Sequence, residues 1–434
     1  MTLTYRRDFL KLGAVAAAGT LLDSTSHGAW AGTLGGSTRG ASLLPGGKGP
    51  RSGMPWFSGG FGNVTTFETW RGRPFDVYGS FLSWGTWAQM KGFPANTSFP
   101  SYVKKDLWIS LGYPLLPKTL SGSEVFASFW DECAAATPVT AAARTFWQNH
   151  DRILTNTANC LKGTGVKCRG LILRVGWEFN GSPWPWKLAT DYTKAPQYRD
   201  VFQRLVGMAR DKMPNVVIEW NPLRKGTEGA AFSEIWPGDD YVDIVSICHY
   251  DRLPSFDSQE IWDAQAVRRY VKTKTTYTYE YNPVTKKNVK VPHVTTLWDN
   301  PWGIQTWADF AHDHGKLFAV PEWALSNGWN YTDNCKDRDN PLFIEFMMNF
   351  FYQNRDILAY ESFFNSSAKH MIYPPGQVPY SAVLEVDGSN KACTSPSPNW
   401  PVNGTGRLTS VNDRASKRYQ ELVKYYYDLT NPVG

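Results

Sequence analysis

The chain has 434 residues, and its 45 Lys and Arg against 39 Asp and Glu leave a formal net charge of +6. This mild balance, with no basic run and no basic amphipathic helix, excludes a typical nucleic-acid-binding protein. No apolar run reaches the ~18 residues of a membrane-spanning helix, so no span is expected. The 20 Trp, 21 Tyr and 23 Phe exceed the needs of a core and indicate flat apolar ligands such as sugar rings.

The N-terminus resembles an export signal. Residues 5–11 (YRRDFLK) carry a twin-arginine pair, a mildly apolar run follows at 12–22, and residues 29–31 (AWA) have the form of a cleavage site. Because these features come in the order of a signal peptide, we prefer this interpretation to a cytosolic alanine-rich helix. It predicts a signal peptide at 1–31, folded export by the twin-arginine machinery, and a periplasmic or secreted protein.

The next segment, 32–55, is rich in Gly, Ser and Pro and is predicted to be a flexible linker or a surface strap. The remaining residues, 56–434, are predicted to form one catalytic domain. Eight short apolar runs predict strands at 57–61, 74–82, 107–114, 170–177, 215–220, 241–248, 316–321 and 357–364. Several lack alternation, as expected for parallel strands that are covered on both faces.

Helical patterns separate these strands, most clearly at 139–162, 198–212, 258–272, 303–314, 340–353 and 412–429. Strand and helix in alternation predict an α/β fold, a (β/α)8 TIM barrel, with an open doubly wound sheet as the second choice. Two long loop insertions are expected, at 273–299 and 366–408. The first alternates Thr, Tyr and Val around Asn282-Pro283, which is typical of a β-hairpin. A monomer is the default expectation.

The cysteine and histidine patterns do not indicate a metal site or a cofactor. The six cysteines contain no C-x2-C pair, and the histidines form no H-x-x-x-H or H-E-x-x-H set. In an oxidising compartment, Cys160 could pair with Cys168 and Cys335 with Cys393, although spacing alone does not give connectivity. Cys248 lies in an apolar run and is predicted to be a buried free thiol.

Two glutamates follow predicted barrel strands. Glu178 follows the fourth strand in RVGWEFNGSPWPW, and Glu322 follows the seventh in KLFAVPEWALS. The C-terminal ends of strands carry the reactive groups of TIM barrels, so both carboxyls are expected at the mouth. A pair of this kind can flank one glycosidic bond, with one carboxyl as the acid and the other as the nucleophile.

The chain resembles glycoside hydrolase family 26, a clan A barrel family whose best-known members are β-mannanases. The resemblance covers roughly residues 57–365 and depends on an ordered set of segments. These are FETWRGRPFDVY (67–78), RVGWEFNGSPWPW (174–186), VVIEWNP (216–222), WPGDDYVDIVSICHY (236–250) and GKLFAVPEWALS (315–326). Each segment alone is a weak signal, but their order is fairly specific.

The resemblance implies a role for each site residue. It implies Glu178 as the general acid/base and Glu322 as the nucleophile of a retaining hydrolase that cleaves a β-linked polysaccharide. Tyr250 would hydrogen-bond Glu322, and Arg174 would pair with it. The remaining residues would bind substrate: Trp177, Trp186 and Trp323 as sugar-facing walls, Asn180 and Asn221 as partners of hydroxyls.

Three positions depart from the family pattern. Trp177 stands where the family has a histidine, Cys248 where it has an aspartate, and Ala324 where it has a glycine. These departures concern the substrate more than the chemistry, because both glutamates are present. Three alternatives stay open: a metal or flavin enzyme, a polysaccharide-binding barrel without turnover, and a transglycosylase that acts on exopolysaccharide.

Overall fold

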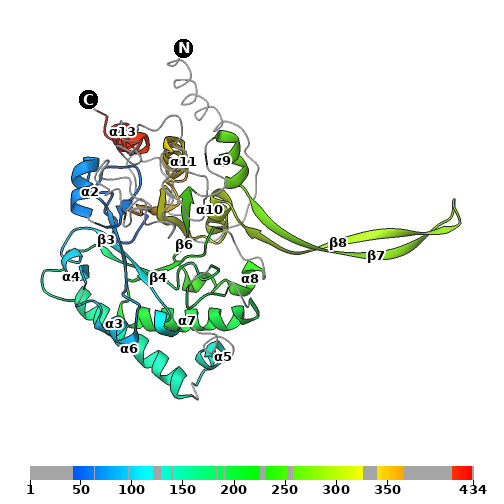
Figure 1. Ribbon diagram of the computed structural model, residues 1–434, viewed down its shortest axis with the longest axis horizontal. Helices are drawn as coiled ribbons and strands as arrows, with labels where there is room; N and C mark the ends of the chain where they lie inside the picture. The colour runs from blue at the N-terminus through cyan, green and yellow to red at the C-terminus, as the bar shows by residue number, and fades with distance from the viewer. Residues whose placement is uncertain are drawn as a thin grey trace, which may run out of the picture. The chain divides into compact units, whose positions relative to one another are not determined.

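The computed structural model describes residues 43–432 except 63, 96, 121–128, 138–139, 182–183, 189–191, 225–230, 252–255, 257, 326–339 and 366–412. Eight parallel strands form a closed barrel with helices around it (Figure 1). In barrel order they are β1 (Ser58–Gly60), β2 (Val77–Phe81), β3 (Trp108–Tyr113), β4 (Gly170–Val175), β5 (Val217–Trp220), β6 (Ile244–Asp251), β9 (Leu317–Leu325) and β10 (Leu358–Phe363). The predicted TIM barrel and its eight strands are confirmed.

Two strands run further than their apolar segments. β6 continues to Asp251 and β9 to Leu325, and the two remain paired through Cys248–Glu322 and Tyr250–Ala324. The prediction ended both strands too early because it followed apolar runs. Strands pair through backbone hydrogen bonds, so polar residues can also belong to a strand. This extension places Glu322 within β9 rather than in the loop after it.

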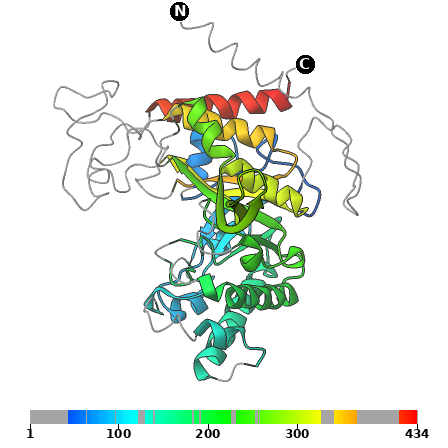
Figure 2. The same cartoon turned by 90° about the vertical axis from the view of Figure 1, so that its right-hand side faces the viewer.

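The helices follow the predicted pattern closely. They are α2 (Val64–Arg71), α3 (Trp87–Gly92), α4 (Phe99–Tyr102), α5 (Phe129–Ala134), α6 (Ala141–Leu161), α7 (Ala195–Lys212), α8 (Phe232–Ile235), α9 (Gln259–Ala266), α10 (Ile304–Asp313), α11 (Pro341–Gln353) and α13 (Asp413–Thr430). Local signals set several starts: Thr140 caps α6, and Asn340 caps α11 before a proline at its first position. Figure 2 shows α13 alongside α11, where Arg418 pairs with Glu345.

The helix predicted at 258–272 ends earlier than expected. α9 stops at Ala266, and a strand, β7 (Arg269–Asn282), begins three residues later. It pairs in antiparallel with β8 (Lys287–Pro301), so the predicted hairpin is confirmed and is longer than predicted. At its tip the Asn282 side chain accepts hydrogen bonds from the backbone N–H groups of Val284 and Thr285. The β-branched and aromatic residues after Ala266 favour a strand over a helix.

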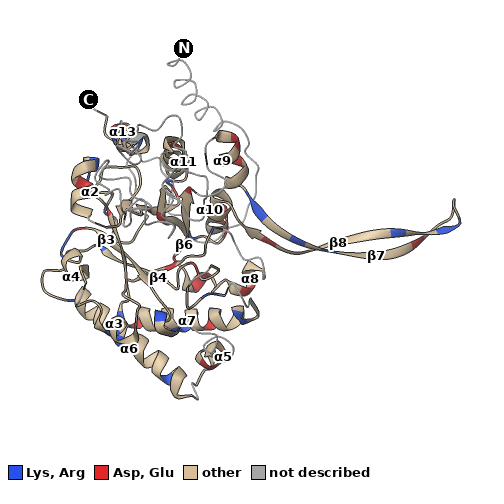
Figure 3. Ribbon diagram, viewed as in Figure 1, with Lys and Arg blue, Asp and Glu red and all other residues tan. Residues whose placement is uncertain are grey.

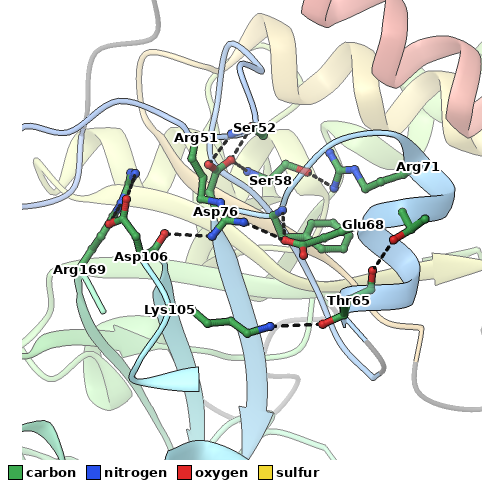
Figure 4. Close-up of polar contacts among 12 residues, drawn as sticks. Arg51, Ser52, Ser58, Thr65, Glu68, Arg71, Asp76, Lys105, Asp106 and Arg169 are labelled. Carbon is green, nitrogen blue, oxygen red and sulfur yellow. Dashed lines mark hydrogen bonds and ion pairs between the residues drawn. The ribbon is translucent and has the colours of Figure 1, made fainter. Parts of the chain in front are cut away.

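Part of the predicted linker is packed chain. Leu44, Ser52 and Met54 are buried, and Asp76 accepts hydrogen bonds from the Ser52 backbone and hydroxyl at 2.9 and 2.6 Å (Figure 4). Asp76 also accepts one from the Ser58 backbone at the start of β1. Of the two alternatives for 32–55, residues 43–55 therefore form the surface strap rather than the flexible linker, whereas 32–42 lie outside the described residues.

The thiols of four cysteines are free: Cys133, Cys160, Cys168 and Cys248. The suggested Cys160–Cys168 disulfide is therefore absent, while Cys248 is the buried free thiol that was predicted. Cys335, Cys393 and the insertion at 366–408 lie outside the described residues. Within the described part of the chain, no helix is long and apolar enough to cross a membrane.

Candidate active site

Glu178 follows β4 on a tight and unusual piece of backbone. Its φ is 53°, in the left-handed region that residues other than glycine seldom occupy. Its N–H donates to the carbonyl of Asn221 at 2.6 Å, and its own carbonyl accepts from Gly181 at 2.8 Å. These contacts hold a conformation that costs on the order of 1–3 kcal/mol, and such strain tends to gather at functional sites.

Glu322 lies on β9 and is nearly buried between a cation and a phenol. The Arg174 guanidinium on β4 is 2.6 Å from one carboxylate oxygen, and the Tyr250 hydroxyl donates to the other at 2.7 Å. Arg174 is fully buried and Tyr250 is half-buried. The barrel therefore brings together three residues that are far apart in the sequence, in the contacts that the family resemblance implied.

The two carboxyls have different electrostatic environments. Burial raises the pKa of Glu178, and the negative charge of Glu322 raises it further, against the opposing effect of hydrogen bonds from Cys248 and Trp184. Burial disfavours the charged form of Arg174, but the carboxylate of Glu322 more than offsets this and raises the pKa of Arg174. The arrangement favours a protonated Glu178 beside a Glu322 that is ion-paired with Arg174, as an acid and nucleophile pair requires.

A polar layer inside the barrel lies below the ion pair. Tyr360 and Ser246 donate to the two oxygens of Glu219, each at 2.5 Å, and the Tyr360 hydroxyl is 2.8 Å from that of Ser110. Burial raises the pKa of Glu219, whereas the charge of Arg174 lowers it. Glu219 was not among the predicted site residues, although a glutamate within the apolar run VVIEW is a signal that could have identified it.

Cys248 lies among the charged groups. Its thiol donates to the Asn221 side-chain oxygen at 3.7 Å and is 4.0 Å from the Arg174 guanidinium. Burial and then the charges of Glu322 and Glu178 raise the pKa of this thiol well above its ordinary value, which keeps it neutral. The side-chain nitrogen of Asn221 is buried without a hydrogen-bond partner among the described residues. A neutral thiol thus occupies a position next to both carboxyls.

The three tryptophans predicted as sugar-facing walls lie in the core. Trp323 is fully buried, and its indole N–H donates to Glu361 at 2.5 Å. Trp186 is fully buried and donates to the carbonyl of Trp177, which is itself 2% exposed. A ring without an exposed face cannot stack on a sugar in this conformation, so the predicted walls are not supported. The error arose because the position of a residue in a motif does not reveal how deeply its side chain is buried.

Asn180 holds two loops together instead of facing the mouth. Its side-chain oxygen accepts from the Leu223 backbone N–H at 2.7 Å, and its amide nitrogen donates to the carbonyl of the same residue. These bonds connect the segment after β4 with the segment after β5. A structural role therefore accounts for the asparagine that was predicted to bind a hydroxyl.

Two other tryptophans are better placed for a ligand. Trp184 is half-buried and donates its indole N–H to Glu178 at 2.9 Å. Trp84, also half-buried, packs edge-on against Trp184 with ring centroids 5.6 Å apart. Trp184 lies in the motif quoted above, but nothing in the sequence distinguished Trp84 from core aromatics.

Among the described residues, no group of three His, Cys, Asp or Glu side chains is arranged to hold a metal ion.

Comparisons with known proteins support the fold. GH26C from Muricauda sp. MAR_2010_75 is 13% identical over 86% of both chains, with a TM-score of 0.51. The catalytic domain of a GH26 endo-β-1,4-mannanase from Bacillus sp. JAMB-750 is 15% identical over 87% of both, with a TM-score of 0.51. A modular endo-β-1,4-mannanase from Cellulomonas fimi is 16% identical over 81% of this chain and 77% of its own, with a TM-score of 0.50. No family model and no curated protein sequence matches the chain.

Proposed function

We propose that the protein is a retaining glycoside hydrolase that cleaves a β-linked polysaccharide, a β-mannan or a related β-glycan. The observation that carries this proposal is the pair of glutamates, one after β4 and one within β9, in contrasting environments. Glu322 is ion-paired with Arg174 at 2.6 Å, whereas burial and the charge of Glu322 raise the pKa of Glu178. Similar folds in endo-β-1,4-mannanases support the proposal without identifying the substrate.

The reaction would take two displacements. The Glu322 carboxylate attacks the anomeric carbon while the glycosidic C–O bond breaks, and Glu178 transfers its proton to the departing oxygen. A glycosyl ester on Glu322 results. Glu178, now ionised, takes a proton from water as the water oxygen attacks the anomeric carbon, which releases Glu322 and restores the proton on Glu178. Tyr250 and Arg174 keep the attacking oxygens of Glu322 in position.

The test is a reducing-sugar assay of residues 32–434 against mannans, β-glucans, xylans and bacterial exopolysaccharides. We expect sugar release from at least one β-linked polymer by the unmodified protein and none by its Glu322→Gln variant. Tight binding to a polymer without release would indicate a binding barrel instead. Growth of product length with added acceptor sugars would indicate a transglycosylase, which shares the covalent intermediate.

Glu178→Ala is expected to affect substrates according to their leaving groups. Polysaccharide cleavage should fall by roughly 10²–10⁴-fold, because an alcohol needs the proton of Glu178 to depart. The rate of the glycosylation step should fall far less for aryl glycosides, because their acidic phenols depart without a proton. The measurement is pre-steady-state release of the phenol beside steady-state polymer cleavage. Equal losses on both substrates would contradict an acid role for Glu178.

Cys248→Asp is expected to extend activity to higher pH. A carboxylate beside Glu178 would oppose its ionisation, so the proton would be lost at a higher pH. The active form needs this proton, so the alkaline limb of kcat/KM should shift upward. Cys248→Ser is the matched control, because it keeps a neutral donor near Asn221. Coinciding alkaline limbs for the two variants would show that charge at this position does not act on Glu178.

We also propose export of the folded protein by the twin-arginine route, with cleavage after residue 31. The supporting observation is the sequence order of the arginine pair, apolar run and A-x-A site. N-terminal sequencing of the protein recovered from the periplasm or medium should begin at residue 32. Recovery of the full chain in the cytosol would contradict this proposal.

A further inference from the structure

The hairpin of β7 and β8 has two unlike faces. Cross-strand pairs place Tyr277 opposite Pro292, Tyr279 opposite Lys290 and Tyr281 opposite Asn288, all on one face. We call this the tyrosine face. The other face carries Thr276, Thr278 and their partners, and is mainly polar. Tyrosine thus alternates along β7 with the polar residues Thr276, Thr278 and Glu280, which is the pattern of a ribbon with one face intended for contact.

The tyrosine face is exposed in this chain. Tyr277, Tyr279 and Tyr281 are 51%, 67% and 62% exposed, and neighbouring tyrosines on one strand are about 6.7 Å apart along its axis. A two-stranded ribbon is marginally stable unless a face is covered. Three exposed aromatic rings in a row are more than scattered surface residues and indicate a binding surface.

The hairpin is positively charged toward its tip. Residues 269–301 carry six Lys and Arg against two Asp and Glu. Arg269 pairs with Asp299 at the base, so the excess lies further out, where Figure 3 shows basic residues along the ribbon. On the tyrosine face, the Lys290 ammonium lies 3.7 Å from the ring centroid of Tyr277. The surface therefore offers aromatic rings with a cation among them.

We propose that the tyrosine face is a second carbohydrate site, separate from the catalytic centre, that holds an acidic polysaccharide. The apolar C–H faces of sugar rings would stack on Tyr277, Tyr279 and Tyr281, while a carboxylate substituent pairs with Lys290. This inference rests on the proposed function, which makes a polysaccharide the ligand of the same chain. A second copy of the hairpin is a poorer fit, because a two-fold contact would bring equal positive charges together.

The test separates this site from catalysis by using the Glu322→Gln background. Binding of the full chain to galactomannan, xylan and mixed-linkage β-glucan, each unmodified and carboxymethylated, would be measured by affinity electrophoresis. We expect the triple variant Tyr277→Ala, Tyr279→Ala, Tyr281→Ala to bind a carboxymethylated polymer roughly tenfold more weakly or worse. Lys290→Gln should weaken the binding of carboxymethylated polymers but not of unmodified ones, and added salt should have the same selective effect.

The matched control is Tyr425→Ala, which removes a 39% exposed tyrosine from α13 and should leave binding unchanged. In the active enzyme, the triple variant should keep its rate on short aryl glycosides. Equal polymer binding by the triple variant and its parent would overturn the proposal, as would binding of no polymer by the parent. A parent that is dimeric by light scattering and a triple variant that is monomeric would identify the face as a contact between copies. If the unmodified enzyme released no sugar while the tyrosine face still bound polymer, the result would contradict the catalytic proposal and leave the second site in place.

Discussion

Glu322→Gln should lower kcat on the polysaccharide substrate by roughly four orders of magnitude or more, because an amide cannot form the glycosyl ester. The side chain keeps its size and can still accept the hydrogen bond that Tyr250 donates at 2.7 Å, although the ion pair with Arg174 at 2.6 Å is lost. The measurement is steady-state cleavage together with thermal unfolding of the same preparation. A folded variant is expected, since Glu219 still opposes the charge of Arg174.

Two controls make this result specific. Tyr250→Phe removes one hydrogen bond to the nucleophile and should lower kcat much less, because the attacking carboxylate remains. Mass spectrometry of the unmodified enzyme with a slow fluorinated glycoside should show one sugar attached to Glu322. Near-normal turnover by a folded Glu322→Gln protein, or a label on another residue, would contradict the assignment of the nucleophile.

Arg174→Met should reduce both activity and stability. It leaves Glu322 buried without its cation, and breaking a buried ion pair by removing one partner costs about 3–5 kcal/mol in free energy of unfolding. Glu219 loses a stabilising charge as well. The nucleophile would lose the group that positions it, so kcat should fall by roughly 10²-fold. Because the charge of Arg174 lowers the pKa of Glu178, its removal should also move the alkaline limb of the rate profile to higher pH.

The pH profile separates an electrostatic role of Arg174 from a purely structural one. A variant that is only less stable would lose activity at all pH values in proportion to its unfolded fraction. Arg174→Lys, which retains a charge but only one donor group, should recover part of the lost activity at neutral pH. An unchanged alkaline limb in a folded Arg174→Met protein would show that the charge of Arg174 does not act on Glu178.

The sequence alone determined the barrel and the two strands, β4 and β9, with which the two glutamates are associated. Apolar runs, caps and turn residues are local features, and each acts over a few neighbours, so the eight strands and the hairpin tip at Asn282 could be predicted from them. Glu178 and Glu322 were expected close to strand ends because the same runs imply where strands end, although β9 continues past Glu322. The resemblance then supplied the contacts of Arg174 and Tyr250 with Glu322.

Only the tertiary structure decided which side chains face the mouth and which face the helices. Trp186 and Trp323 are buried in the core, whereas half-buried Trp184 reaches Glu178. Cys248 contacts Arg174 of β4 and Asn221, which follows β5. Ser52, in the segment before β1, donates a hydrogen bond to Asp76. These contacts depend on the register of strand pairing and the closure of the barrel, which join residues distant in the chain and leave no periodic signal in the sequence.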